Sequence, residues 1–413
     1  MKDTEFCSQI LGISSPWYVS SVEIKREENA VHAFLSYEEQ FKNWPCPECG
    51  TACTIYDHRE QRTWRDLDSC HFKTYITATL PRVKCKVHGV HTVRVPWSEA
   101  NSHFTILFEC LTIKILLATQ VQFKTAELLK QSPDQVKYIM HKSVDRGMER
   151  RDKEELIPHL SLDEKSYKKG HHYITVLSDS TNKRVIDIVD KRLKSTTEKL
   201  ITESLRPLQR GKVKSVSMDM WEPFMTAVTD ILPNADIVHD RFHIAKYLNK
   251  AVDDTRRDEN QELYKHADKT LNKTKYLWLK SHVKMTTKQL NAFAALKDLP
   301  LETAKVWAFK ESFKKFFDCQ TVLSAQLFFY QWYEAALLLK NKHLTKAAQT
   351  LQTHLKGLLA YATHRVTNAS AEGLNSLIQQ VNSNAKGYHK FSNLRIAILF
   401  FLGKLDLYPH KVP

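Results

Sequence analysis

The spacing of apolar residues changes along the chain and divides it into regions. Residues 1–45 are mixed, and their alternating stretch from Val19 to Leu35 predicts strands. Short alternating runs continue to Trp97, whereas from residue 104 the apolar spacing becomes helical. Three helical segments are expected, at 104–118, 124–129 and 134–148, and Ser132 and Pro133 suit the cap and first turn of the third.

A second pattern follows from about residue 155 to the end of the chain. Short β runs alternate with helical stretches, which predicts an α/β core. Between about residues 245 and 362 the pattern is helical, often amphipathic, and rich in lysine and aromatic residues, so we expect an all-helical insertion. The expected strands are 160–162, 173–177, 185–189, 213–218 and 237–238, and the expected helices outside the insertion are 222–232, 368–382 and 394–405.

The composition and charge of the chain indicate which kinds of partner the protein binds. The 413 residues are 42% hydrophobic with ten glycines and 13 prolines, which indicates globular order. A formal charge of +15 implies an acidic partner; nucleic acid is the commonest, although ribosome or membrane-surface association would share this charge. The most apolar stretch, 327–339, is too short to span a membrane, and no signal peptide is visible. We therefore expect a cytoplasmic protein without a membrane partner.

Two short motifs predict a zinc site. Cys46 and Cys49 have the two-residue spacing of a zinc knuckle, and Cys85 and His88 repeat it 36 residues after Cys49. Two knuckles supply four tetrahedral ligands, so Zn²⁺ would be structural here. The alternative is that these are unligated surface and core residues. Further candidate ligands are Cys53, His58, Cys70 and His91.

The helices before residue 150 suggest a DNA reader. A short helix, a turn at 131–133 and a third helix match a helix-turn-helix, whose last helix would enter the major groove. The alternative is a packed bundle of helices. The candidate DNA-binding residues on the third helix are Gln135, Lys137, Tyr138, His141 and Lys142.

Three carboxylates form the candidate catalytic set. Asp163 and Asp219 each end an expected strand, so their side chains meet if those strands are neighbours. Glu372 begins an amphipathic helix whose apolar stripe would fix its position. Carboxylate oxygens suit Mg²⁺ or Mn²⁺, and a two-metal site can cleave phosphodiesters. Taken singly, a strand-end aspartate is usually a turn former and a helix-face glutamate is usually solvated.

The ordered motifs resemble those of transposases of the ISL3 insertion-sequence family, over roughly residues 40–410. That group of DDE transposases has an RNase H-like catalytic fold, so the resemblance implies that Asp163, Asp219 and Glu372 are the catalytic triad. It further implies that Asp240 and His243, in the stretch Val238-His-Asp-Arg-Phe-His243, support the active site, together with Asn368 and Asn375. The family's second knuckle commonly carries cysteine where this chain has His88.

The spacing between the three carboxylates fits that architecture. Asp163 and Asp219 are 56 residues apart, and Glu372 follows 153 residues later, too far for one simple crossover. Within the inserted region, tryptophans at 278, 307 and 332 could stack on a flipped base, although core packing is the ordinary role of such residues.

The sequence therefore predicts a multidomain α/β protein: an RNase H-like core interrupted by an all-α insertion and preceded by a zinc-binding finger and a helix-turn-helix. We expect a transposase that binds terminal inverted repeats and target DNA as a homodimer or larger assembly, within the bacterial nucleoid. The alternatives are a domesticated, non-catalytic DNA-binding protein and a nuclease or resolvase that never rejoins DNA. The expected domains are an N-terminal segment 1–45, the finger 46–98, the helix-turn-helix 100–150, the core 155–244, the insertion 245–362 and the second core part 363–413.

Overall fold

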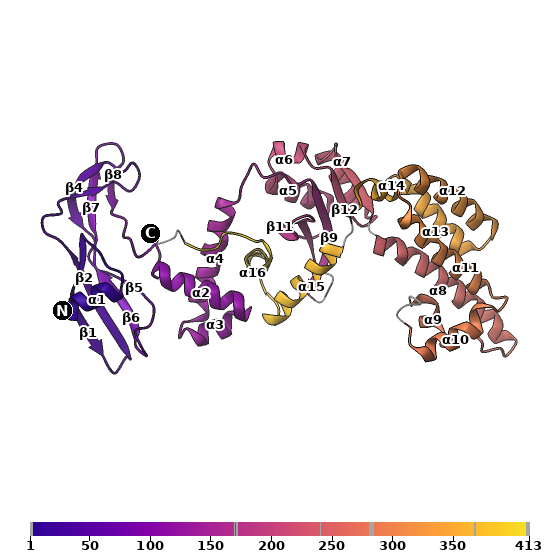
Figure 1. The fold of residues 1–413 in the computed structure, drawn as a ribbon, viewed down its shortest axis with the longest axis horizontal. Helices are drawn as coiled ribbons and strands as arrows, with labels where there is room; N and C mark the ends of the chain where they lie inside the picture. Colours follow the sequence, from indigo (N-terminus) through magenta and orange to yellow (C-terminus); the bar gives the residue numbers. More distant parts are fainter. Residues whose placement is uncertain are drawn as a thin grey trace. The chain divides into compact units, whose positions relative to one another are not determined.

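The computed structural model describes residues 3–168, 170, 172–239, 241–280, 285–366 and 369–409. The chain divides into two compact units, which are described separately below (Figure 1). The first unit comprises Met1–Arg151 with Leu405–Pro413, and the second comprises Asp152–Lys404. None of the helices in the described ranges is both long and apolar enough to cross a membrane.

The first unit begins with two four-stranded sheets, of order β1-β2-β6-β5 and β3-β4-β7-β8. Strand β2 pairs in parallel with β6, so residues 1–45 are not the separate N-terminal segment that the sequence suggested. Trp17, Trp44, Trp64 and Trp97 from both expected segments are buried in one core. The elements are α1 (Asp3–Ile10), β1 (Trp17–Lys25), β2 (Ala30–Tyr37), β3 (Asn43–Pro45), β4 (Ala52–His58), β5 (Arg62–Arg65), β6 (Lys73–Ala78), β7 (Pro81–Cys85) and β8 (Gly89–Thr92).

Three helices follow, α2 (Ile106–Thr119), α3 (Gln122–Leu128) and α4 (Pro133–Arg150). Ser132 caps α4: its hydroxyl accepts from the Gln135 amide, while the Gln135 side chain accepts from the Ser132 amide. This reciprocal cap satisfies two donors that the helix itself cannot. The apolar side chains of Val136, Ile139 and Met140 on the inner face of α4 are fully buried, because this helix packs on α2 and α3.

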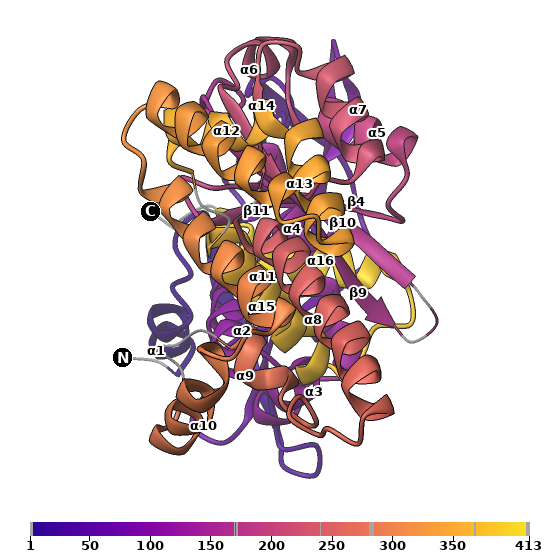
Figure 2. The ribbon, with the colours of Figure 1, turned by 90° about the vertical axis from the view of Figure 1, so that its right-hand side faces the viewer.

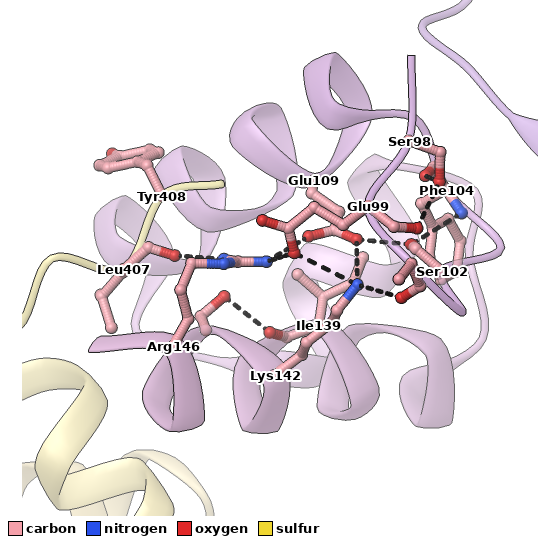
Figure 3. Close-up of polar contacts among 12 residues, drawn as sticks. Ser98, Glu99, Ser102, Phe104, Glu109, Ile139, Lys142, Arg146, Leu407 and Tyr408 are labelled. Atoms are coloured by element: carbon pink, nitrogen blue, oxygen red, sulfur yellow. Dashed lines mark hydrogen bonds and ion pairs between the residues drawn. The ribbon is translucent and has the colours of Figure 1, made fainter. Parts of the chain in front are cut away.

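Ionic contacts on the same buried face also hold α4 (Figure 3). The Arg146 guanidinium donates to the carboxylates of Glu99 (2.6 Å) and Glu109 (2.9 Å), and also to the carbonyl oxygen of Leu407 (2.6 Å). Glu109 is fully buried, and Ser102 donates a 2.5 Å hydrogen bond to it. The last described residues of the chain therefore belong to the packing of α4, not to the second core part expected at 363–413.

The second unit contains a five-stranded sheet of order β11-β10-β9-β12-β13. Strands β9, β10 and β11 are antiparallel, whereas β12 and β13 run parallel to β9. Helix α5 (Lys194–Ser204), which the sequence analysis did not predict, covers the core of this sheet with α7. The other elements are β9 (His159–Lys168), β10 (His172–Asp179), β11 (Arg184–Asp190), α6 (Pro207–Gly211), β12 (Ser215–Met218), α7 (Glu222–Ile231) and β13 (Asp236–His239).

Within the described residues from Arg241 to His364 the regular elements are all helices (Figures 1 and 2). These helices share one large apolar core. Trp278 and Trp332 are buried in it and Trp307 packs on Phe293, which confirms the core-packing interpretation of the tryptophans. The elements are α8 (Arg241–Lys265), α9 (Lys275–Leu279), α10 (Thr287–Lys297), α11 (Glu302–Ser312), the 3₁₀ helix η2 (Phe313–Asp318), α12 (Val322–Leu338), α13 (Lys342–Thr353) and α14 (Leu355–His364).

The chain then returns to the sheet. Helix α14 lies against β13, where Gly357 approaches the buried ring of His239 so closely that a Cβ there would lie 2.3 Å from it. Helix α15 (Ala369–Asn384) packs on β9, and α16 (Phe391–Leu402) packs on β11. Residues far apart in sequence are thereby brought to the central strand.

Candidate active site and zinc centre

Asp163 lies within β9, and Asp219 directly follows the neighbouring strand β12. Strand β12 runs parallel to β9 with Ser217 opposite Ser161. Asp219 lies two residues beyond Ser217, and Asp163 lies two residues beyond Ser161, so both aspartates follow the last paired residues of these two strands. Both carboxylates are half-buried, and each accepts a hydrogen bond from the next backbone amide, at 2.7 Å for Asp163 and 2.6 Å for Asp219.

Helix α15 adds a third side chain to this pair. The Asn375 amide nitrogen donates a 2.7 Å hydrogen bond to Asp163 Oδ2. Leu374, Ile378 and Val381 are buried, which holds the helix against the sheet. Glu372 lies three residues before Asn375, so the two share a helix face, and its side chain is exposed.

Helix α8 approaches Asp219 from the other side. His243 Nδ1 lies 3.3 Å from Asp219 Oδ1. One turn later stands Tyr247, which the sequence analysis missed: burial and then the negative charge of Asp219 raise the pKa of its phenol. Tyr247 could have been predicted from its position four residues after His243, because side chains four residues apart lie next to each other on a helix. Asp240 and Asn368 lie outside the described residues.

The second candidate site is formed by the two knuckles of the first unit. The Cys49 and Cys85 sulfurs are 3.8 Å apart, and His88 Nδ1 lies 3.6 Å from Cys85 Sγ and 3.9 Å from Cys46 Sγ. Sulfur ligands about 2.3 Å from a tetrahedral zinc ion lie about 3.8 Å from one another. The donor set therefore fits Zn²⁺ without rearrangement.

Backbone geometry explains why both knuckles have this shape. Each is followed by a glycine with positive φ, Gly50 at 73° and Gly89 at 80°, so the chain turns back with little strain. The amides of His88 and Val87 point at the Cys85 sulfur and lower the pKa of that thiol to about 6, which favours the thiolate that binds metal.

The four further candidate ligands are placed differently. Cys53 donates to the Thr51 carbonyl oxygen, His58 pairs with the Tyr37 hydroxyl, and His91 Nε2 contacts the His88 carbonyl oxygen. Cys70 is exposed. Among the described residues, only Cys46, Cys49, Cys85 and His88 form a group of three or more metal-binding side chains.

Comparison with known proteins decides the family. The model of the ISL3 family of DDE proteins, described as transposase, matches residues 160–398, more than half of the chain. The chain belongs to the ISL3 transposase family. A second model, the zinc finger of the transposases of IS204, IS1001, IS1096 and IS1165, matches residues 42–88 and so contains all four candidate zinc ligands. This match and the converging ligand atoms support a structural zinc in this transposase.

Curated relatives of this ISL3 transposase are of the same kind. The transposase for insertion sequence element IS1001 of Bordetella parapertussis is 25% identical over 347 residues, which cover 83% of this chain and 85% of the relative. The transposase for IS1557 of Mycobacterium tuberculosis is 25% identical over 261 residues, 62% of this chain and 58% of the relative. An ISL3 transposase is an enzyme of DNA transposition, and DNA is its partner.

The residues expected to read DNA lie on α4 of this transposase, and several hold the helix in place. The Tyr138 hydroxyl donates to the Asn101 carbonyl oxygen at 3.2 Å. Lys142 pairs with Glu99 at 3.3 Å, and Gln135 closes the helix cap. Lys137 and His141 are half-buried. Base contact by Tyr138, Lys142 or Gln135 would thus exchange an intramolecular bond for one to DNA.

Proposed function

We propose that this ISL3 transposase binds the terminal inverted repeats of its insertion sequence and catalyses strand cleavage followed by strand transfer, with Asp163, Asp219 and Glu372 as its catalytic carboxylates. The observation that carries the proposal is the meeting of three separate segments. Asp163 and Asp219 each lie two residues beyond the last paired serines of two parallel neighbouring strands, and Asn375, on the helix of Glu372, hydrogen-bonds to Asp163.

The arrangement of the second unit supports an RNase H-like core. Three antiparallel strands are followed by two strands parallel to the central β9; Asp163 lies within β9, and Asp219 directly follows the neighbouring strand β12. The helical region enters after β13 and leaves before α15, which returns beside β9. Such an insertion lengthens the path between Asp219 and Glu372, while α15, which carries Glu372, packs on β9.

The donor set fits divalent cations. The carboxylates of Asp163 and Asp219 are both half-buried, and two such charges brought close together repel each other unless positive charge lies between them. Oxygen ligands of this kind suit Mg²⁺ or Mn²⁺, and Glu372, exposed on the face of α15 that carries Asn375, would complete the set. When bound, the ions supply charge stabilisation for in-line phosphoryl displacement by water or a 3′ hydroxyl.

The protein's own residues have positioning roles in this scheme. Asn375 donates to one oxygen of Asp163, which fixes the rotamer of that carboxylate and directs its other oxygen. His243 does the same for Asp219 from α8. Because no covalent protein intermediate is needed, catalysis rests on orientation and electrostatics.

The first unit is proposed to bind the DNA ends. Its zinc ribbon lies within the matched residues 42–88, and α2, α3 and α4 have the order of a helix-turn-helix. The charge of +15 supplies attraction to phosphates. Since two ends must be held together for transposition, we expect a homodimer or larger assembly on DNA.

The deciding experiment is cleavage of DNA that carries the inverted repeats flanking the gene, in Mg²⁺ or Mn²⁺. Intact protein should nick at the repeat boundary and join the released 3′ end to a target duplex, whereas Asp219→Asn should bind without cutting. A matched control is Asp230→Asn, because Asp230 is an exposed residue of α7 paired with Lys194. Retained cleavage by Asp219→Asn refutes the site.

The same assay separates the two competing functions. Binding without cutting by the intact protein, across metal conditions, would favour a non-catalytic DNA-binding protein. Cutting without joining a marked donor end would favour a nuclease or resolvase.

A further inference from the structure

Arg192 lies between β11 and α5 and contacts three other segments of the second unit. Its Nη1 donates to both carboxylate oxygens of Glu164 on β9, at 3.0 and 2.8 Å. The guanidinium carbon lies 4.5 Å from the ring centroid of Tyr173 on β10, and 4.9 Å from that of Trp221, the residue before α7. A planar guanidinium that is paired and stacked in this way is held in one orientation. It therefore joins β9, β10 and the start of α7.

Two of these contacts adjoin the proposed catalytic carboxylates. Glu164 directly follows Asp163, and its backbone amide donates the 2.7 Å hydrogen bond to Asp163 Oδ1. Trp221 follows Asp219 by two residues, and the amide of Met220 between them donates the 2.6 Å hydrogen bond to the aspartate. Each carboxylate is thus oriented by a backbone amide that lies within one residue of a side chain held by the guanidinium.

The ion pair itself lies on the other face of the sheet from Asp163. Successive side chains of a strand point to opposite faces, so Glu164 and Asp163 project from opposite faces of β9. Leu162, which shares the face of Glu164, is buried in the apolar core formed with α5 and α7. On the other face, Asn375 of α15 contacts Asp163. Glu164 is therefore turned away from the metal-binding face, and Arg192 reaches the carboxylates through the backbone.

We propose that Arg192 is a positioning residue of the active site, which fixes the backbone beside Asp163 and beside Asp219 so that both carboxylates bind the same divalent cations. The inference rests on the proposed function and adds a residue to its machinery. Because the Trp221 side chain is 39% exposed, its burial restrains the ring only in part, and the stack with Arg192 supplies a second restraint. Residues that orient metal ligands without touching the ion typically contribute about 10- to 100-fold in metal affinity.

The test measures the binding of Mn²⁺ to the full chain by electron paramagnetic resonance. The protein is in complex with a terminal-repeat duplex already cut at the repeat boundary, so that no cleavage changes the complex during the titration. The same complex of Asp219→Asn gives the binding that does not depend on the proposed site. Arg192→Gln should weaken the Asp219-dependent binding about 10- to 100-fold, with DNA affinity unchanged.

A matched control separates positioning from general stability. Arg395 on α16 makes a comparable pair with Asp187 of β11, at 2.7 and 2.6 Å. Its side chain is 34% exposed, against 38% for Arg192. Arg395→Gln should lower the unfolding temperature about as much as Arg192→Gln does and leave Mn²⁺ affinity unchanged, whereas a merely structural role for Arg192 would make the two variants alike in both measurements.

A second pair of variants tests the same inference without removing the arginine. Trp221→Leu should weaken Mn²⁺ binding because it removes the ring beside the guanidinium, and Trp221→Phe should retain most of the affinity because it keeps one. This pair decides the question if Arg192→Gln fails to fold. Equal Mn²⁺ affinity in the leucine and phenylalanine variants would then overturn the inference.

The remaining outcomes distinguish the inference from the function on which it rests. If Asp219→Asn loses Mn²⁺ binding but Arg192→Gln binds it as the intact protein does, only the role of Arg192 is wrong. The same holds if Arg395→Gln weakens Mn²⁺ binding by the same factor as Arg192→Gln. If the intact protein binds no more Mn²⁺ than Asp219→Asn, the proposed catalytic site fails, and the role of Arg192 fails with it.

Discussion

Replacing Arg146 by methionine would break the ionic core that holds α4. Only 7% of the Arg146 side chain is exposed. Its guanidinium donates to Glu99, to the fully buried Glu109 and to the carbonyl oxygen of Leu407. Methionine keeps much of the side-chain length and removes the charge. The buried carboxylate of Glu109 would then lose the closer of its two positively charged partners.

The expected cost follows from the remaining contacts. Removing one partner of a buried ion pair typically lowers the free energy of unfolding by about 3–5 kcal/mol, because the other charge stays buried without a partner. Here Lys142 Nζ remains 3.6 Å from Glu109 and the Ser102 hydrogen bond persists, so we expect the lower end. A loss of about 3 kcal/mol raises the opening equilibrium of α2 and α4 roughly 150-fold.

Hydrogen exchange of peptides from α2 and α4 measures this opening in the full chain, separately from the second unit. The double variant Glu109→Gln with Arg146→Met should recover much of the loss, because no charge is then stranded. Arg150→Met is the control, since Arg150 pairs with the exposed Asp406. The reasoning is refuted if Arg146→Met changes the opening free energy by less than about 1 kcal/mol, or if the double variant is no better than the single one.

Four further outcomes are expected. Asn375→Ala should lower the cleavage rate with DNA affinity unchanged in a binding titration, because the hydrogen bond to Asp163 is lost. Zinc content by elemental analysis should stay near one per chain in His88→Cys and fall in His88→Ala, since a thiolate can replace the imidazole. Gly357→Ala should destabilise the second unit by about 1–3 kcal/mol in urea unfolding, because its Cβ would meet the ring of His239. Burial lowers the pKa of His239 to about 4, so between pH 6.5 and 4 this histidine is protonated in the unfolded chain but neutral in the folded chain. The free energy of unfolding should therefore fall as the pH is lowered from 6.5 to 4. A His239→Leu variant should show a smaller dependence of stability on pH.

Several elements could be predicted because their signals are local. The cap of α4 depends on Ser132 and Gln135 within one turn, and the expected helix 134–148 is observed as Pro133–Arg150. The knuckles likewise depend on spacing alone, and their four ligand atoms lie within 4.8 Å of one another. Helix α5 was missed since its residues 194–204 carry a weak apolar pattern with several threonines.

Other features required the whole fold. The pairing of β2 with β6 joins residues 1–45 to the finger region, and no local pattern predicts a parallel partner 43 residues away. Strand β9 continues to Lys168, well beyond the expected end at 162, because β10 pairs along its length. The return of the last described residues to Arg146 is equally non-local.

By itself, the sequence determined the candidate chemistry of this transposase: the metal-ligand types, the order of the three carboxylates, and the division between β-rich, helical and α/β regions. These follow from residue identity and from periodicities of two and 3.6 residues. Only the tertiary structure decided that β12 pairs in parallel with β9, that Asn375 contacts Asp163, and that His243 lies beside Asp219. Such relations depend on strand register and helix packing, which are set by interactions between distant segments rather than within them.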